Sequence, residues 1–338
     1  MYKKILAAIL SAVLMFCLAA CSADKNKDTK AEKTDITFCL EWTPNTNHTG
    51  LYVALQKGYY DEAGLNVQIV QPPENSAATQ VCAAGQAQFT VEGQDTLAAA
   101  FTSENEIGVT AVATILQHNT SGIMSKAGSG MDKPAGLTGN TYLTWDSPIE
   151  LAIMKNVVEN GGGDWNKVHI IPNTVTEEAQ DVNENPNHAI WVFYGWGGIN
   201  AKVSGVDVDY FSFKDIDKTF DYYTPVIVGN NDFLKENPKA TKAFMQATAK
   251  GYEYAAKHPE EAAQILIDSD DTGALTGCEE LVLESQKWIS EQYIADADKW
   301  GTIDSERWNK FYDWLWENKL IEKQINKDFG FTNEFLPQ

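Results

Sequence analysis

Short β-rich segments alternate with helical segments along the first part of this chain, and that rhythm constrains the fold more than any other feature. The strand predictions rest on apolar, β-branched runs, and the helix predictions on apolar side chains at helical spacing. The predicted strands are residues 35–41, 65–70, 87–91 and 109–115, and the predicted helices between them are 47–57, 76–84 and 96–101. Strands that alternate with helices pair in parallel, so we expect a parallel sheet covered by helices.

A second series of the same kind follows. Its strands are expected at residues 139–143, 167–171, 189–194 and 206–213, and its helices at 147–159 and 177–183. The first of these helices has a strong start signal, because Ser147 suits the cap, Pro148 the first turn and Glu150 the third position after the cap. The second series therefore predicts a second α/β unit.

The chain after residue 228 is mostly helical, with helices predicted at 238–257, 259–267, 279–292 and 305–319. Two α/β units with a helical return predict two lobes joined by two crossings, which we place near residues 117–125 and 222–230. Lobe 1 is then discontinuous (35–122 and 226–338), and lobe 2 is 123–225. A small ligand is expected in the cleft between the lobes, with hinge closure around it.

The N-terminus predicts export. Lys3 and Lys4 precede an apolar run over residues 5–20 that ends in Leu18-Ala19-Ala20-Cys21, which resembles the lipobox of bacterial lipoproteins. Residues 1–20 are then a signal peptide, Cys21 is lipidated, and the polar residues 21–34 form a flexible tether. The alternative, a transmembrane anchor, needs a longer apolar run. We expect the chain on the extracytoplasmic face of the cell membrane, held by its lipid.

The net charge and the scarcity of arginine limit the kinds of ligand and macromolecule that the chain is expected to bind. With 47 acidic and 26 basic residues the formal net charge is −21, so nucleic acid, which needs clustered Lys and Arg, is not expected. Arg307 is the single arginine. Arg is the side chain best suited to carboxylate, sulfonate or phosphate, so its scarcity favours a neutral or cationic ligand. The 10 Trp, 13 Tyr and 14 Phe suit a flat aromatic one.

The sequence contains none of the common catalytic or nucleotide-binding motifs, and its cysteines and histidines show no metal-ligand spacing. We therefore expect no cofactor and no metal. Of the cysteines beyond Cys21, which are Cys39, Cys82 and Cys278, two allow one disulfide, and the alternative is that all three are buried as small apolar side chains.

Several stretches carry a family resemblance. Glu41-Trp42-Thr43-Pro44-Asn45-Thr46-Asn47-His48-Thr49-Gly50 resembles the start of substrate-binding proteins for pyrimidine precursors of thiamine. The stretches 117–122, 144–148 and 191–196 are also similar, and the likeness spans essentially the whole domain after the tether. That family is related to sulfonate-binding proteins and to the eukaryotic thiamine-pyrimidine synthase.

The resemblance implies a type II periplasmic-binding-protein fold. This is an α/β architecture of two lobes, each a mostly parallel sheet flanked by helices, with two hinge crossings. It also implies a monomer that hands a small heteroaromatic ligand, hydroxymethylpyrimidine or formylaminopyrimidine, to an ABC permease.

The candidate ligand-binding residues lie mainly at the carboxyl ends of predicted strands, where α/β sheets place ligands. Two aromatic side chains would sandwich a flat ring, and carboxylates or amides would accept from its amine. Trp191 lies mid-strand and is expected in the core. The candidates are Trp42, Asn45, His48, Glu92, Asp95, Asn119, Ser121, Trp145, Tyr194, Trp196 and Tyr223.

One departure from the family pattern concerns the ligand. Pyrimidine-binding relatives usually have an acidic residue where this chain has Gly197, so either Glu92, Asp95 or Asp146 replaces it or the ligand differs. The alternatives are a riboflavin-like or sulfonate ligand, a structural lipoprotein without ligand, and a pyrimidine synthase. The synthase would need a Lys and a His before residues 96–99 and cysteines near 220–225, which are missing here.

Overall fold

The computed structural model describes residues 33–73, 76–104, 107–172, 175 and 177–337. The predicted signal peptide, the lipidated Cys21 and all but the last two residues of the tether lie outside these residues. Residues 34–338 form one compact unit. No helix in the described part of the chain is both long enough and apolar enough to cross a membrane.

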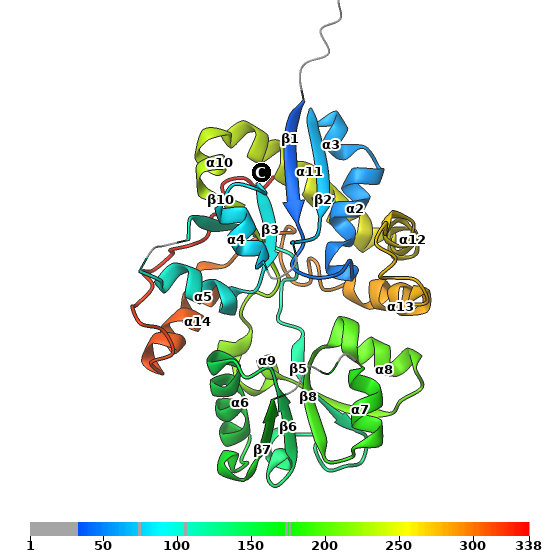
Figure 1. Ribbon diagram of the computed structural model, residues 1–338, viewed down its shortest axis with the longest axis vertical. Helices are drawn as coiled ribbons and strands as arrows, with labels where there is room; N and C mark the ends of the chain where they lie inside the picture. The colour runs from blue at the N-terminus through cyan, green and yellow to red at the C-terminus, as the bar shows by residue number, and fades with distance from the viewer. Residues whose placement is uncertain (1–32, 74–75, 105–106, 173–174, 176, 338) are drawn as a thin grey trace, which may run out of the picture. The chain divides into compact units, whose positions relative to one another are not determined.

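Two five-stranded sheets organise this unit (Figure 1). The first has the order β2-β1-β3-β10-β4, and the second β7-β6-β8-β5-β9. The strands of the first sheet are β1 (Thr34–Cys39), β2 (Leu65–Val70), β3 (Phe89–Glu92), β4 (Val109–Thr114) and β10 (Val226–Asn230). Those of the second are β5 (Ser121–Lys126), β6 (Thr141–Thr144), β7 (His169–Pro172), β8 (His188–Phe193) and β9 (Val208–Ser212).

Both sheets are mixed. In the first, β1 pairs in parallel with β2 and β3, whereas β10 pairs antiparallel with β3 and β4. In the second, β5 is the antiparallel strand, between β8 and β9. The other strands of each sheet share one direction. The antiparallel strands are the ones by which the chain enters the second sheet and returns to the first. Because four of the five strands in each sheet run in one direction, the predicted mostly parallel α/β architecture is confirmed.

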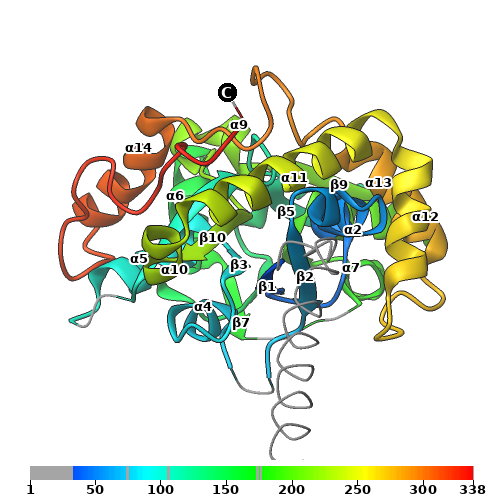
Figure 2. The same ribbon diagram turned by 90° about the horizontal axis from the view of Figure 1, so that it is seen from above.

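Helices cover both faces of the first sheet. In the two views, α4, α5 and α14 lie on one side of it and α2, α12 and α13 on the other (Figures 1 and 2). The helical segments before β5 are η1 (Thr46–His48), α2 (Thr49–Gln56), α3 (Tyr59–Glu62), α4 (Ala78–Ala83) and α5 (Gln94–Thr102). Those after β10 are α10 (Asn231–Glu236), α11 (Pro238–Lys257), α12 (Pro259–Ser269), α13 (Glu279–Ile289) and α14 (Ser305–Glu317).

The helical segments between β5 and β10 accompany the second sheet. They are η2 (Pro134–Leu137), α6 (Pro148–Asn160), η3 (Trp165–Lys167), α7 (Glu178–Glu184), the π-helix η4 (Tyr194–Gly198), α8 (Ile199–Val203), α9 (Phe213–Ile216) and η5 (Lys218–Phe220). The predicted strand 65–70 and helix 238–257 coincide with β2 and α11. Most other predicted elements are displaced by a few residues at their ends.

Strand β5 was not predicted, because its residues were assigned to a hinge. Its sequence, Ser-Gly-Ile-Met-Ser-Lys, has little strand signal. The structure explains why residue 122 is glycine: a Cβ there would lie 2.2 Å from the carbonyl oxygen of Phe211 on β9. A residue that weakens a strand locally is thus required by tight packing within the sheet. The lobe bounds predicted from the sequence remain a prediction.

The three cysteines within residues 33–337 form no disulfide. Cys39, Cys82 and Cys278 are free, the first two fully buried and the third partly exposed. Burial raises the pKa of Cys39 to about 11 and that of Cys82 to about 12, so both stay protonated as apolar core side chains.

Candidate functional site

Three carboxylates gather where β1 and β3 end. Glu41 follows β1, Glu92 is the last residue of β3, and Asp95 lies in the first turn of α5, after its N-cap residue Gly93. Adjacent parallel strands bring their carboxyl ends to one edge of the sheet, which explains this gathering. An acid in the first turn also suits the positive end of a helix.

The loop after β1 is fixed by the contacts of the His48 ring with Glu41 and Asn45. Nε2 of His48 lies 2.9 Å from Oε2 of Glu41, and Nδ1 of the same ring accepts from the backbone N–H of Asn45 at 3.2 Å. Asn45 in turn accepts from the N–H of Asn47 and donates to the carbonyl of Thr43. Burial would raise the pKa of Glu41, but the charge of His48 and its hydrogen bond hold it below the ordinary value. His48 and Asn45 therefore shape the loop that carries Trp42.

Glu92 and Asp95 hold their protons more tightly than ordinary carboxylic acids. Glu92 accepts from the hydroxyl of Thr79 at 2.5 Å and from the N–H of Gly93 at 3.0 Å. Burial nevertheless raises the pKa of Glu92, and the negative charge of Glu41 adds to the effect. Burial also raises the pKa of Asp95 to about 6, with the charge of Glu92 as the second cause. A ligand that donates hydrogen bonds or carries positive charge would relieve this repulsion.

Two large aromatic side chains that follow strands are exposed, one after a strand of each sheet. Trp42 follows β1 and has 56% of its surface exposed, and Trp145 follows β6 with 52% exposed. The Trp145 ring lies 5.6 Å from that of Trp191. Exposed tryptophan rings provide flat faces for stacking.

The turn from β6 into α6 is tightly ordered. Asp146 has φ of 63°, a left-handed conformation that is uncommon for a residue other than glycine. Ser147 and Glu150 form the predicted capping box. Glu150 also accepts from the hydroxyls of Tyr142 and Thr144 and from the N–H of Trp145. Backbone strain held in place this way is often found at functional sites.

Trp191 is in the core, as predicted, with 4% of its surface exposed. Its indole N–H has no hydrogen-bond partner among the described residues. Its ring packs at 4.2 Å from that of Phe213.

The segment after β8 forms the π-helix η4, a rare element that often marks functional sites. Gly197, within it, faces the core: a Cβ there would lie 2.9 Å from Cβ of Val192. The acid of the family pattern would have no room in this conformation. Trp196 packs against the cluster of Tyr52, Leu266 and Val282.

Tyr194 lines a cavity of about 420 Å³ at the carboxyl ends of β8 and β9, the same edge of the second sheet at which β6 ends. Its ring lies 4.9 Å from Tyr210 and 5.1 Å from Trp288. Asn119 lines the same cavity. A larger cavity of about 700 Å³ lies along α14 and is lined by none of the predicted residues.

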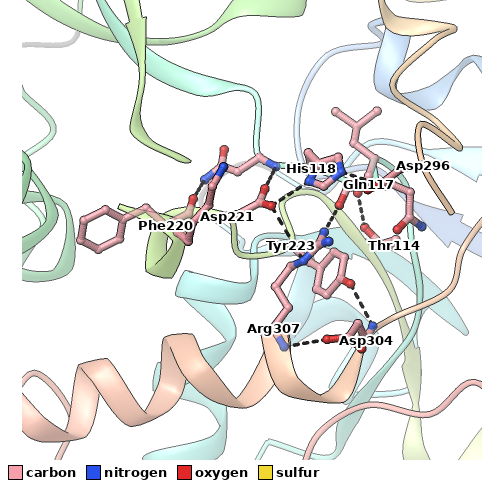
Figure 3. A network of polar contacts seen from close by, with 12 residues as sticks. Thr114, Gln117, His118, Phe220, Asp221, Tyr223, Asp296, Asp304 and Arg307 are labelled. Carbon is pink, nitrogen blue, oxygen red and sulfur yellow. Dashed lines mark hydrogen bonds and ion pairs between the residues drawn. The ribbon is translucent and has the colours of Figure 1, made fainter. Parts of the chain in front are cut away.

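Asn119, Ser121 and Tyr223 belong to a polar network at the two crossings, part of which is drawn in Figure 3. Asn119 donates to the carbonyl of Phe220 and accepts from both the N–H and the hydroxyl of Ser121. The Tyr223 hydroxyl accepts from the N–H of Asp304. The polar groups of these three residues are thus engaged within the protein, and their contact with a ligand stays a prediction.

His118 and Arg307 complete the network (Figure 3). His118 lies 2.7 Å from Asp221 and 2.9 Å from Asp296. Its hydrogen bond to Asp221 raises the pKa of His118, against the effect of burial. The Arg307 guanidinium donates to the carbonyl of Gln117 and lies 5.0 Å from the ring centre of Tyr223. The single arginine of the chain therefore holds the crossings together.

Within the described residues, no group of three or more His, Cys, Asp and Glu side chains is arranged to hold a metal ion. Glu41 was not predicted as a site residue, although an acid directly after the first strand is a usable signal. The network of His118, Asp221 and Arg307 was not predicted either. No local signal identifies that network, because its members are far apart in the sequence.

Comparisons with known proteins identify the family and the fold. A family model described as "NMT1/THI5 like" matches residues 45–262. The chain is 28% identical to the formylaminopyrimidine-binding protein of Halalkalibacterium halodurans, over 96% of this chain and 97% of that protein. It is 22% identical to the 4-amino-5-hydroxymethyl-2-methylpyrimidine phosphate synthase of Legionella pneumophila, over 90% and 93% of the two chains.

A solved structure shares the fold. The ligand-binding component of an ABC-type import system from Staphylococcus aureus superposes with a TM-score of 0.66 at 12% identity, covering 90% of this chain and 98% of that one. At this identity the likeness concerns the fold.

Proposed function

The chain belongs to the NMT1/THI5-like family, and on that premise we propose that it is the solute-binding component of an ABC importer for an aminopyrimidine precursor of thiamine. It binds the ligand between the two α/β units and releases it, without chemical conversion, to a permease. The relative that binds formylaminopyrimidine matches nearly the full length of the chain and supports this ligand class.

The observation that carries the proposal is the trio of carboxylates beside an exposed tryptophan. A 4-aminopyrimidine presents an exocyclic amine and a ring nitrogen that accepts a proton, and both favour carboxylate partners. Glu92 and Asp95, whose pKa values are raised, lie at the strand ends where such an edge would bind. Trp42 and Trp145 offer faces for the ring.

A sulfonate or other anion fits less well. The Arg307 guanidinium is occupied by the Gln117 carbonyl and the Tyr223 ring. The charges that gather at the ends of β1 and β3 are negative and would repel an anion. The missing acid at Gly197 is thus offset by carboxylates of the first sheet, on the opposite side of the proposed ligand.

Binding without turnover is supported by the sequence. The synthase pattern of Lys and His before residues 96–99 is absent, as are cysteines at 220–225. We therefore propose a binding protein rather than an enzyme, although relatives with the synthase name also match.

The cell-envelope part of the proposal rests on the N-terminal sequence. Residues 1–20 would be removed, Cys21 would carry the lipid, and residues 22–34 would link it to the folded unit. In this arrangement the monomeric protein captures ligand outside the cytoplasmic membrane and remains near its permease.

A thermal-shift series on the full chain in mild detergent tests the ligand. The panel is hydroxymethylpyrimidine, formylaminopyrimidine, thiamine, riboflavin and taurine. A ligand at 100 times its Kd adds about 2.7 kcal/mol of stability, a rise in Tm of roughly 4–8 °C. A rise with a pyrimidine supports the proposal, and a rise only with riboflavin or taurine contradicts it. Mass spectrometry of the recovered pyrimidine should show it unchanged.

A further inference from the structure

The indole N–H of Trp191 is a hydrogen-bond donor without an acceptor. Trp191 lies on β8 with 4% of its surface exposed, and Nε1 has no partner among the described residues. Buried donors are almost always paired, because leaving one unpaired loses its hydrogen bond to water. An exception in a native protein therefore calls for an explanation.

Two polar side chains at the adjacent end of β6, Thr144 and Glu150, are already engaged in hydrogen bonds. The parallel register pairs Leu143 of β6 with Ile190 of β8, which places Trp191 beside Thr144. The Thr144 hydroxyl donates to Glu150 and accepts from the N–H of Asp146. The Glu150 carboxylate is shared among several donors of the same turn.

This position also adjoins an exposed aromatic side chain. Thr144 ends β6, and the next residue is the half-exposed Trp145, whose ring lies 5.6 Å from that of Trp191. The 13-residue helix α6 begins three residues later, after Asp146 in its left-handed conformation. A helix N-terminus, a stacking face and an unpaired donor thus meet at one strand end.

We propose that Trp191 recognises the ligand, donating its indole N–H to a carbonyl oxygen or ring nitrogen of a heteroaromatic ring that stacks on Trp145. This inference rests on the proposed function and sharpens it. Glu92 and Asp95, at the first sheet, accept hydrogen bonds from the amine edge of the ligand. Trp191, in the second sheet, donates one hydrogen bond to an acceptor elsewhere on the ligand. The preferred ligand then needs both features, as formylaminopyrimidine has.

The test compares Trp191→Phe, which keeps an aromatic ring and removes the N–H, with Trp145→Phe, which keeps a stacking face. Binding of formylaminopyrimidine to the full chain is measured by calorimetry. We expect Trp191→Phe to weaken binding about tenfold, equivalent to about 1.4 kcal/mol, and Trp145→Phe to weaken it much less. If Trp191→Phe binds as tightly as the wild type, the N–H instead faces the ring of Phe213 and the inference is wrong.

A second measurement needs no variant at position 191. In a spectrum of the chain labelled with ¹⁵N-tryptophan, one indole proton signal should move downfield when formylaminopyrimidine is added. It should stay in place with the same pyrimidine lacking its acyl group if the acceptor is the formyl oxygen, and move with both if it is a ring nitrogen. A spectrum in which no indole signal moves downfield contradicts the inference. Failure of the wild type to bind any pyrimidine would instead contradict the proposed function.

Discussion

Oδ2 of Asp221 lies 2.7 Å from Nδ1 of His118, so a residue just before β10 is paired with one just before β5. The two residues belong to the two separate stretches by which the chain passes between its sheets. Asp221 also accepts from the N–H of Asn119 at 3.0 Å. One carboxylate therefore ties both crossings together.

His118→Gln should destabilise the protein by about 1 kcal/mol, lowering Tm by about 2 °C, because the histidine is partly exposed and its ion pairs are screened. The pKa of His118 is raised in the folded state. Its stabilising effect is therefore complete below about pH 6.5, the pKa of an unfolded histidine, and is lost as the pH rises through the folded pKa. Urea unfolding of both proteins between pH 6 and 9 checks this.

Asp296→Asn is the matched control for that change, since Asp296 contacts the same ring from the more exposed side. It should have a smaller effect than His118→Gln. An equal difference between wild type and His118→Gln at every pH would mean that packing, and not charge, is what the histidine contributes.

Asp95→Asn should stabilise the unliganded protein and weaken ligand binding. The pKa of Asp95 is raised to about 6 from an ordinary value of 3.8. Charging it therefore costs stability as the pH rises from about 4 to 6, and the full cost remains above pH 6. At pH 7 we expect the variant to be more stable by about 1–2 kcal/mol, with the difference vanishing near pH 4.

Calorimetry with an aminopyrimidine should show at least tenfold weaker binding for Asp95→Asn. Glu306→Gln, which removes an exposed acid of α14, serves as a control for the loss of one negative charge. Equal losses of affinity in both variants would show that net charge, and not the position of Asp95, governs binding.

Glu41→Gln should destabilise the protein by about 1–2 kcal/mol near pH 7, because it removes the charged partner of His48. The pKa of Glu41 is lowered, so its contribution is present above the ordinary value of 4.5 and is lost as the pH falls through the folded pKa. Urea unfolding at pH 7 and pH 4 measures the difference. A double-mutant cycle with His48→Asn should show that the two changes are not additive.

Gly197→Asp should not restore the acid of the pyrimidine-binding pattern. The new Cβ would meet Val192 at 2.9 Å, so we expect a loss of about 1–3 kcal/mol and no gain in pyrimidine affinity. Gly197→Ala, which adds the Cβ alone, should be destabilised to a similar degree. Tighter pyrimidine binding by Gly197→Asp would show that the π-helix rearranges to present the carboxylate.

Local pattern predicted the elements well where each has its own signal. The capping residues at Ser147 and Glu150 gave the start of α6 correctly, and the apolar run of β2 gave its exact bounds. β5 was not predicted, because Gly122, which weakens its strand signal, is required by the close approach of the neighbouring strand β9. Its antiparallel position between β8 and β9 depends on residues far away in the sequence. Periodicity reports on a segment and its solvent exposure, and it contains no information about which strand comes to lie beside it.

Those candidate site residues that lie at the ends of strands could be predicted, because the strands themselves could be predicted. Trp42, Glu92, Asp95 and Trp145 lie at carboxyl ends of strands, as expected, and their contact with a ligand stays a prediction. Asn119, Ser121 and Tyr223 were chosen because they sit at the crossings. Asn119 binds one crossing to the other through the carbonyl of Phe220, the Ser121 hydroxyl donates to Asn119 within its own crossing, and the Tyr223 hydroxyl accepts from the N–H of Asp304. A single sequence cannot distinguish a polar residue that faces a ligand from one that faces a distant part of its own chain.

Because β10 lies between β3 and β4 although it follows the whole second sheet in the sequence, the topology also sets the order in which the two sheets can be completed during synthesis. The second sheet needs nothing beyond Ser212, whereas the first, although begun earlier, lacks the strand between β3 and β4 until Val226–Asn230 have been made. At about 5–20 residues per second, the ribosome takes on the order of 10 s to pass from β4 to β10. The sheet begun first is therefore the last to close, and until then the edges of β3 and β4 that pair with β10 stay unpaired.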